Sequence, residues 1–227
     1  MVNVLILILL PLWITKRWAK TKEKQRSEWI AGVSHDIRTP LSIVMGNAEK
    51  GSIIEKQCFK IRDLVNNLNT ENKLEGGTGK WNETDIKLAE LLRELVCDYV
   101  NLNEEQYFYN LDIDSELEES VIRADVSLIR RMIDNLISNA VRHNEKGCEV
   151  NVSLNKTSNN RMLMIISDNG MGVSEDELKK LNKHVKYDYL PEHGLGIRVV
   201  KQIGKRYRYK INFKSEKGKY FQCNILF

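Results

Sequence analysis

A histidine followed directly by an aspartate, in the stretch VSHDIRTPL that begins at Val33, is the first place where the sequence offers chemistry. Apolar residues recur around it every three or four positions, which predicts a helix with one apolar stripe. They are Ile30, Val33, Ile37, Leu41 and Val44. At about 100° per residue, His35 points away from this stripe and toward water. A neutral imidazole with Asp36 beside it is suited to act as a nucleophile, although an exposed histidine can also be a plain surface residue.

The second stretch with chemical potential is NLISNAVRH, which begins at Asn135 and is expected on a helix. Asn135 and Asn139 are one helical turn apart and therefore share a face. Their amide oxygens are suitable ligands for Mg²⁺ or its waters, and the following Arg142 and His143 can meet phosphates. The alternative is that both asparagines only bond to the backbone or to solvent.

Two glycine-containing stretches come later in the chain. DNGMG begins at Asp168, at the end of an expected strand, and places a carboxylate where glycine backbone can approach a ligand. Such a carboxylate can accept from an exocyclic amine such as that of adenine. HGLGI begins at His193 and opens a helix, where N–H groups are available to a phosphate. Each stretch alone also fits an ordinary turn, and the segment 182–191 between them could be a mobile lid over a nucleotide.

The overall composition is typical of a folded globular protein. The 227 residues carry a net charge of +4, with 42% hydrophobic and 29% charged residues, which allows a sizeable core. The four cysteines are scattered and form no CxxC pair, which favours reduced thiols over a zinc site or a disulfide framework. Basic residues gather at 16–26, but no aromatic platform or reading helix accompanies them, so nucleic acid is not an expected partner.

Residues 2–14 are almost wholly apolar and are followed directly by this basic cluster. As a helix the segment would extend only about 20 Å, against a hydrocarbon core of roughly 30 Å. A signal peptide would carry its positive charges before the apolar run, not after it. We therefore expect residues 1–15 to be a membrane anchor or part of a transmembrane segment, with the rest of the chain cytoplasmic. A buried or peripheral helix is the alternative.

The element expected to position His35 is a helical hairpin. Its first helix should run from about residue 21 to 48, and a turn at Gly51 leads into a second helix. The apolar positions of that second helix are Ile54, Cys58, Ile61, Val65 and Leu68. Two helices cannot bury such narrow stripes by themselves, and pairing with a second copy would complete a four-helix bundle. The hairpin thus predicts a homodimer.

Residues 81–227 show alternating helical and strand patterns, which predict an α/β (α+β) two-layer sandwich. Glycine-rich residues 76–80 before it are suited to be a linker, so the chain is expected to be multi-domain. Helices are expected at 86–100, from 126 after an Asp125 cap, at 175–181 after a capping box of Ser174 and Glu177, and at 196–203. Strands are expected at 107–113, 121–122, 149–154, 162–167, 209–213 and 220–227.

Taken in order, the stretches VSHDIRTPL, NLISNAVRH, DNGMGV and HGLGI closely resemble the sensor histidine kinases of bacterial two-component systems. The resemblance extends over nearly everything after residue 25. It implies an all-α dimerisation and phosphotransfer hairpin at 16–75, joined to an ATP-binding catalytic domain of the GHKL type at 81–227. It also implies that the protein autophosphorylates from ATP and Mg²⁺ and then phosphorylates an aspartate on the receiver domain of a response regulator.

The same resemblance implies roles for individual residues. His35 would be the phosphoryl acceptor with Asp36 as its base or orienting group, and Thr39 would position water when the regulator is dephosphorylated. Asn139 would be the magnesium ligand. The nucleotide site would comprise Asn135, Asn139, Arg142, His143, Asp168, Gly170, Gly172, Gly194, Leu195 and Gly196.

The chain departs from the family pattern between the two glycine motifs. The expected phenylalanine-rich segment is absent, with Tyr187 and Tyr189 as the candidate substitutes, and Glu192-His193 stands where an additional glycine is frequent. Two alternatives therefore stay open. One is a degenerate scaffold that binds nucleotide and dimerises without transfer. The other is a GHKL-type ATPase that uses water, which would want a carboxylate near Asn135.

Overall fold

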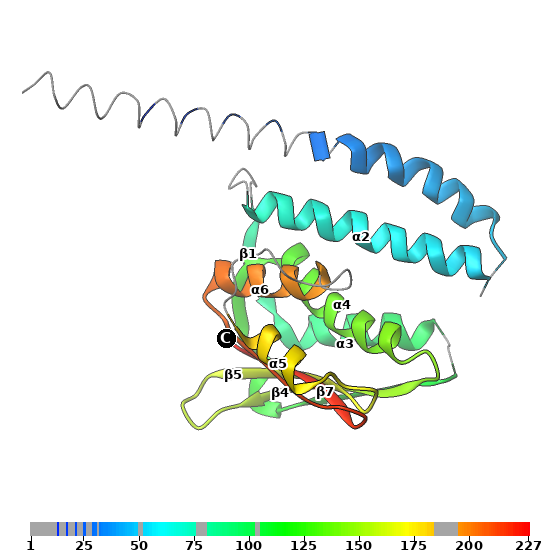
Figure 1. The fold of residues 1–227 in the computed structure, drawn as a ribbon. Helices are drawn as coiled ribbons and strands as arrows, with labels where there is room; N and C mark the ends of the chain where they lie inside the picture. The colour runs from blue at the N-terminus through cyan, green and yellow to red at the C-terminus, as the bar shows by residue number, and fades with distance from the viewer. Residues whose placement is uncertain are drawn as a thin grey trace, which may run out of the picture. The chain divides into compact units, whose positions relative to one another are not determined.

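The computed structural model of the protein divides into two compact units, residues 1–80 and residues 81–227 (Figure 1). The residues that it describes are 13, 17, 21, 25, 29–30, 32–49, 52–75, 81–102, 105–183 and 195–227. Gly194, most of the expected lid and all of the expected anchor except Trp13 lie outside these residues. Among the helices described, none is long and apolar enough to cross a bilayer.

The first unit contains the predicted helical hairpin. Residues 32–47 are helical through Pro40, and α2 (Ile53–Glu75) follows after a short turn in which the Ser52 hydroxyl accepts from the Glu55 amide at 3.1 Å. The Arg38 guanidinium donates to Asn66 Oδ1 at 3.2 Å and so ties the two helices together. The hairpin confirms the expected helical part of the fold.

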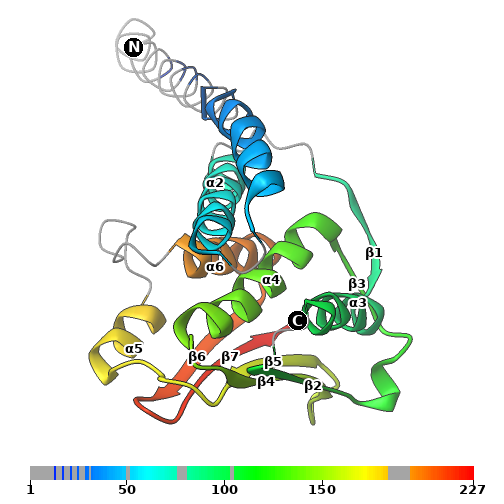
Figure 2. The same ribbon diagram turned by 90° about the vertical axis from the view of Figure 1, so that its right-hand side faces the viewer.

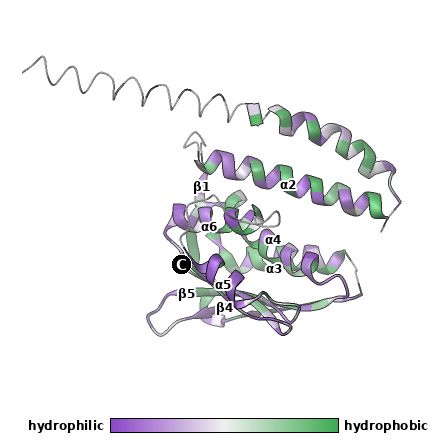
Figure 3. Cartoon of the chain, in the orientation of Figure 1, coloured by the Kyte–Doolittle hydropathy of each residue, from purple (hydrophilic) through white to green (hydrophobic). Residues whose placement is uncertain are grey.

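The apolar stripes of this hairpin are only partly buried within one chain. Ile30 and Cys58 are buried. Other stripe residues keep 37% to 58% of their surface exposed, namely Ile37, Val44, Ile54, Ile61 and Leu68. Figure 3 shows apolar residues along both helices. These exposed stripes are the surface that a second hairpin would cover in a four-helix bundle.

The second unit is built on a five-stranded mixed sheet in the order β2-β4-β5-β7-β6. Its strands are β2 (Tyr107–Ile113), β4 (Cys148–Lys156), β5 (Met162–Asp168), β6 (Lys210–Glu216) and β7 (Tyr220–Leu226). Only the β2–β4 pair is parallel, and the other three pairs are antiparallel. A separate antiparallel ribbon joins β1 (Glu83–Lys87) to β3 (Val121–Asp125).

Three helices cover one face of this sheet (Figure 2). They are α3 (Leu88–Asn101), α4 (Val126–His143) and α6 (Leu195–Tyr207). Along β4 the buried residues alternate with partly exposed Glu149, Asn151 and Ser153, so only one face of the strand meets the helices. The short helix α5 (Glu175–Asn182) packs beside β6, where the Asn182 side chain bonds to the backbone of Phe213. The expected two-layer α/β class is confirmed.

Both predicted helix caps are present. Asp125 precedes α4 and accepts from the Ser127 amide at 2.9 Å. Ser174 and Glu177 form the reciprocal capping box at the start of α5. Caps of this kind depend on neighbours in the chain, which is why the sequence alone reveals them.

The predicted start of the first helix of this unit is wrong. Ile86 is not its first residue but belongs to β1, and α3 begins at Leu88. Ile86 is buried opposite Ile122 of β3, so pairing with a distant strand determines its conformation. The last helix is also longer than predicted and continues to Tyr207.

The end of α6 places an arginine where glycine is usual. Arg208 has φ +60°, and the amides of Arg208 and Tyr209 donate back to the carbonyls of Lys205 and Gly204. This is the left-handed helix ending that glycine adopts without steric cost, whereas a side chain there costs about 1 kcal/mol. We expect Arg208→Gly to raise the free energy of unfolding, measured by urea denaturation, by roughly 0.5–1 kcal/mol.

Asn160 provides the control for this prediction. It has φ +59° in the turn between β4 and β5, but asparagine tolerates the left-handed region. Asn160→Gly should therefore change stability by less than Arg208→Gly does. Equal effects of the two substitutions would show that backbone strain at Arg208 is not the cause.

Candidate functional site

His35 lies on the exposed side of its helix, as predicted. Its side chain is 78% exposed and that of Asp36 is 85% exposed, with 3.5 Å between His35 Nδ1 and Asp36 Oδ1. Because Nδ1 faces the carboxylate, Nε2 is the nitrogen left for an incoming electrophile. Thr39 is exposed one helical turn further on, while Ser34 is buried.

Asn135 occupies the middle of α4 with its side chain turned inward. It is 3% exposed, and its Nδ2 has no hydrogen-bond partner among the described residues. Gly196 of α6 lies beside it, since a Cβ at Gly196 would be 3.4 Å from Asn135 Oδ1. A buried amide donor without a partner costs free energy, which a bound ligand or water would recover.

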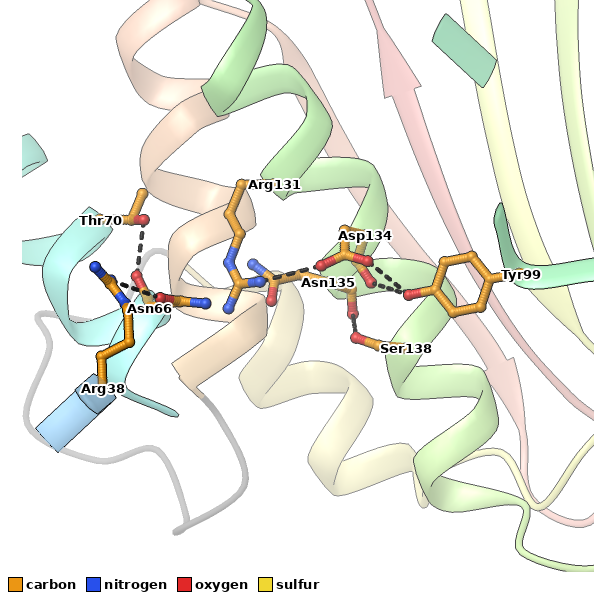
Figure 4. Close-up of polar contacts among 8 residues, drawn as sticks. All are labelled: Arg38, Asn66, Thr70, Tyr99, Arg131, Asp134, Asn135 and Ser138. Carbon is orange, nitrogen blue, oxygen red and sulfur yellow. Dashed lines mark hydrogen bonds and ion pairs between the residues drawn. The ribbon is translucent and has the colours of Figure 1, made fainter. Parts of the chain in front are cut away.

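The preceding residue, Asp134, is engaged elsewhere. Tyr99 on α3 donates its hydroxyl to Asp134 Oδ1 at 2.6 Å, and Arg131 Nη1 lies 3.0 Å from Oδ2. Figure 4 shows the Asp134 carboxylate directed at the Tyr99 hydroxyl. This carboxylate is thus held in a structural network between α3 and α4.

Asp168 is the last residue of β5 and is only 6% exposed. Its Oδ1 accepts two hydrogen bonds, from Asn144 Nδ2 at 3.1 Å and from the Gly170 amide at 3.0 Å. Burial raises the pKa of Asp168 above the ordinary value, and these two hydrogen bonds act against that rise. The described residues supply no donor to Oδ2, which leaves this oxygen for a ligand.

The loop after Asp168 is held at Met171 by two hydrogen bonds. The Met171 amide donates to Asn144 Oδ1 at 2.8 Å, at the end of α4, and the Met171 carbonyl accepts from the Gly218 amide in the β6–β7 turn. Gly172 has φ +54° and passes close to the backbone of that turn. The glycines of DNGMG are therefore required by backbone conformation and close approach.

The other expected site residues are distributed as follows. Asn139 and Arg142 are half-buried on α4, His143 is its exposed last residue, and Leu195 is the first residue of α6. The structure brings together Asn135 with Gly196, and the end of α4 with Asp168 and Gly170. The expected nucleotide-site residues that the structure describes thus come from α4, the loop after β5 and the start of α6. His35 belongs to the other unit.

Sequence reasoning missed Asn144. It follows the NLISNAVRH stretch directly and contacts Asp168, but its amide could equally have faced water at the end of the helix. The only available signal was its position next to a candidate site.

This donor and acceptor set fits a purine nucleotide. A buried acceptor at Asp168 Oδ2 suits an exocyclic amine, and the unpaired Asn135 Nδ2 suits a phosphate oxygen. In the part of the chain that the structure describes, no group of three His, Cys, Asp or Glu side chains could hold a metal ion.

Comparison with protein families identifies two domains. Residues 25–77 match the His Kinase A (phospho-acceptor) domain. Residues 124–227 match the histidine kinase-, DNA gyrase B- and HSP90-like ATPase family. Together these matches take in most of the chain, in the order that the sequence motifs imply.

The chain is also similar to individual histidine kinases and sensor proteins. The chain is 28% identical over 209 residues to the sensor histidine kinase YvrG of Bacillus subtilis, covering 83% of this chain and 36% of that protein. It is 30% identical over 230 residues to the sensor protein KdpD of Clostridium acetobutylicum, covering 90% of this chain and 25% of that protein. The fold is similar to that of full-length ShkA in complex with AMPPNP, with a TM-score of 0.60 and 21% identity over 87% of this chain and 45% of that chain.

The chain spans about a third or less of the length of these curated relatives. Within it, a hairpin with an exposed histidine precedes a helix-covered sheet, and each part matches the corresponding family model. The chain therefore belongs to the sensor histidine kinases of two-component systems.

Proposed function

We propose that the protein phosphorylates its own His35 from Mg-ATP and passes the phosphoryl group to an aspartate of a response regulator. The observation that carries this proposal is the exposed His35 side chain with Asp36 at its Nδ1. A nucleophile that must meet a separate nucleotide-binding unit and then a second protein has to be accessible in this way. Residues 16–75 would be the phosphotransfer hairpin and residues 76–80 the linker across which the catalytic unit moves.

In the proposed reaction, the lone pair of His35 Nε2 attacks the γ-phosphorus in line with the bond to the leaving ADP oxygen. The new N–P bond forms as that P–O bond breaks, and ADP leaves. Positive charge then develops on the imidazole, whose Nδ1–H faces the Asp36 carboxylate. Asp36 stabilises this charge or accepts the proton, which leaves a neutral phosphohistidine.

The nucleotide would be held by residues of the second unit. Asp168 Oδ2 accepts from the adenine amine, and Asn135 Nδ2 donates to a phosphate oxygen. Arg142 and His143 at the end of α4 neutralise phosphate charge. Mg²⁺, when bound through Asn139 and the phosphates, supplies further neutralisation of the γ-phosphate. The glycines at 170, 172, 194 and 196, with Leu195, would shape the pocket and lid.

The described acids near Asn135 do not favour an ATPase that uses water. An amide at position 135 cannot take a proton from water, and the neighbouring Asp134 is held by Tyr99 and Arg131 (Figure 4). Without a general base at this place, the histidine of the hairpin is the better acceptor.

We further propose the assembly and location of the protein. The exposed stripes of the hairpin support a homodimer through a four-helix bundle. The apolar run at 2–14 followed by basic residues supports attachment to the cell membrane with the kinase units in the cytoplasm. The response regulator would dock through its receiver domain on the hairpin around His35.

Incubation of the full chain with γ-labelled ATP and Mg²⁺ tests the proposed function. We expect a phosphoprotein whose label is lost in acid and kept in base, because a phosphoramidate N–P bond has this lability. A scaffold or an ATPase would give no labelled protein, and a label stable to acid would place the phosphate on a residue other than histidine.

Thr39 is expected to act in the dephosphorylation of the response regulator. Its hydroxyl is exposed on the same helix as His35 and could position water against a regulator phosphate. Thr39→Ala should leave autophosphorylation unchanged and slow the loss of phosphate from the regulator by roughly 10-fold or more. The measurement is the decay of labelled regulator after removal of ATP, and an unchanged decay rate would exclude this role for Thr39.

A further inference from the structure

Asn144 is a buried amide in which both polar side-chain atoms have hydrogen-bond partners. It is 6% exposed and follows the last turn of α4. Its Nδ2 donates to the Ala140 carbonyl at 2.8 Å and to Asp168 Oδ1 at 3.1 Å, while its Oδ1 accepts from the Met171 amide at 2.8 Å. One side chain therefore connects α4, the end of β5 and the loop that follows.

The loop is shaped around this amide. A Cβ at Gly170 would lie 1.9 Å from Asn144 Oδ1, so any other residue at 170 would displace the amide. The Gly170 amide in turn donates to Asp168 Oδ1, beside the bond from Asn144. The same atom of Asp168 is thus held twice, once from the helix and once from the loop.

This arrangement assigns different roles to the two carboxylate oxygens. With Oδ1 occupied by two protein donors, the carboxylate cannot rotate without losing both, and Oδ2 is presented for an outside donor. An ionised carboxylate oxygen accepts hydrogen bonds and cannot donate one. It would attract the exocyclic amine of adenine and repel the 6-oxo group of guanine.

We propose that Asn144 is a positioning residue that sets the preference of this site for adenine over guanine by fixing Asp168 Oδ1. This inference rests on the proposed function, because it takes Asp168 as the group that meets the base. It adds the residue that keeps Asp168 oriented and in its acceptor form.

The electrostatic surroundings agree with this role. Burial raises the pKa of Asp168, and the hydrogen bond from Asn144 opposes that rise. Cys148 on β4 interacts electrostatically with Asp168, and burial raises the pKa of its thiol to about 11, so it stays neutral near pH 7. Loss of the Asn144 donor would remove one of the two hydrogen bonds that oppose this rise and that hold Oδ1 in place.

Asn144→Asp is the most informative test because it keeps the size of the side chain and the acceptor for the Met171 amide. It removes the donors and places a second carboxylate about 3 Å from Asp168, where the two cannot both ionise easily. At pH 8 we expect the affinity for ATP to fall by at least tenfold and the ratio of ATP to GTP affinity to fall with it. Between pH 8 and pH 6 the shared proton restores a donor to Asp168 Oδ1, so ATP affinity should rise in the variant and not in the unmodified protein.

The measurements are dissociation constants for ATP and for GTP, with Mg²⁺, by titration calorimetry on the full chain at several pH values. Asn144→Ala should also lose the preference for ATP over GTP, and its ATP affinity should not rise at low pH. This variant still tests the positioning role if the Asp variant does not fold. Asn169→Asp is the matched control. Its exposed side chain accepts from the Glu149 amide, a bond that aspartate keeps, so ATP affinity should stay within about twofold.

The outcomes separate this inference from the proposed function. If the unmodified chain does not bind ATP, the proposed function fails and the inference fails with it. If it binds ATP in preference to GTP, but the folded Asn144 variants show the same preference and pH profile, only the positioning role is overturned. The positioning role is supported if both variants lose the preference for ATP over GTP and only the Asp variant regains ATP affinity as the pH falls. A purely structural defect would not be reversed by lower pH.

Discussion

Replacing His35 with alanine is expected to abolish the incorporation of phosphate from γ-labelled ATP, while the dissociation constant for ATP stays unchanged. The alanine removes the Nε2 nucleophile that the Asp36 contact leaves available. Transfer to a nitrogen depends on positioning a specific lone pair, and methyl groups offer none. The nucleotide residues belong to the other unit, so ATP binding should not respond.

The structure offers a control on the same helix. Ser42 is exposed and its hydroxyl donates only to the Arg38 carbonyl one turn back. Ser42→Ala should therefore keep normal labelling. Both variants are measured by autoradiography of the protein after incubation with ATP and Mg²⁺, and by calorimetry for ATP binding. Label that persists in His35→Ala would mean that another residue accepts the phosphoryl group.

Local chemistry made much of the fold predictable from sequence. The hairpin helices follow from apolar spacing, and the starts of α4 and α5 follow from caps at Asp125 and Ser174. Strand β2 also has the predicted bounds, because its residues alternate between the two faces. Each of these features depends on residues that lie close together in the chain.

Features set by distant partners were not predictable in this way. Strand β1 forms because Ile86 pairs with Ile122, and nothing in the local sequence separates Ile86 from the helix that follows. The parallel pairing of β2 with β4 inside an otherwise antiparallel sheet likewise depends on the whole topology. Sequence motifs can name elements without fixing how they pair.

The candidate site also combines features that the local sequence predicts with features that depend on distant contacts. Asp168 and the glycines stand out in sequence because their types and order are unusual, and the structure gives them burial and close approach. Asn144 has no such signature, yet it holds Asp168 Oδ1 and the Met171 amide. Residues that position a ligand-binding group are found only when three-dimensional contacts are known.

The substitution Gly172→Ala is expected to damage both stability and nucleotide binding. Gly172 has φ +54°, and a Cβ there would lie 2.4 Å from the Glu216 carbonyl oxygen and 2.7 Å from that of Tyr220. These are backbone atoms of the β6–β7 hairpin, so they cannot yield as a flexible side chain would. The left-handed backbone costs about 1 kcal/mol and the clash adds more, for a total loss of roughly 2–4 kcal/mol in the free energy of unfolding.

Gly218→Ala separates the two contributions to this loss. Gly218 also has a left-handed backbone, with φ +79°, but a Cβ there would meet nothing within 4 Å. It should cost only the conformational penalty, about 1 kcal/mol by urea denaturation. In Gly172→Ala the displaced loop should also move Met171 away from Asn144, so ATP affinity should fall by more than tenfold, whereas Gly218→Ala should retain it. Equal losses of stability in the two variants, or normal ATP affinity in Gly172→Ala, would show that this close approach does not hold the nucleotide loop in place.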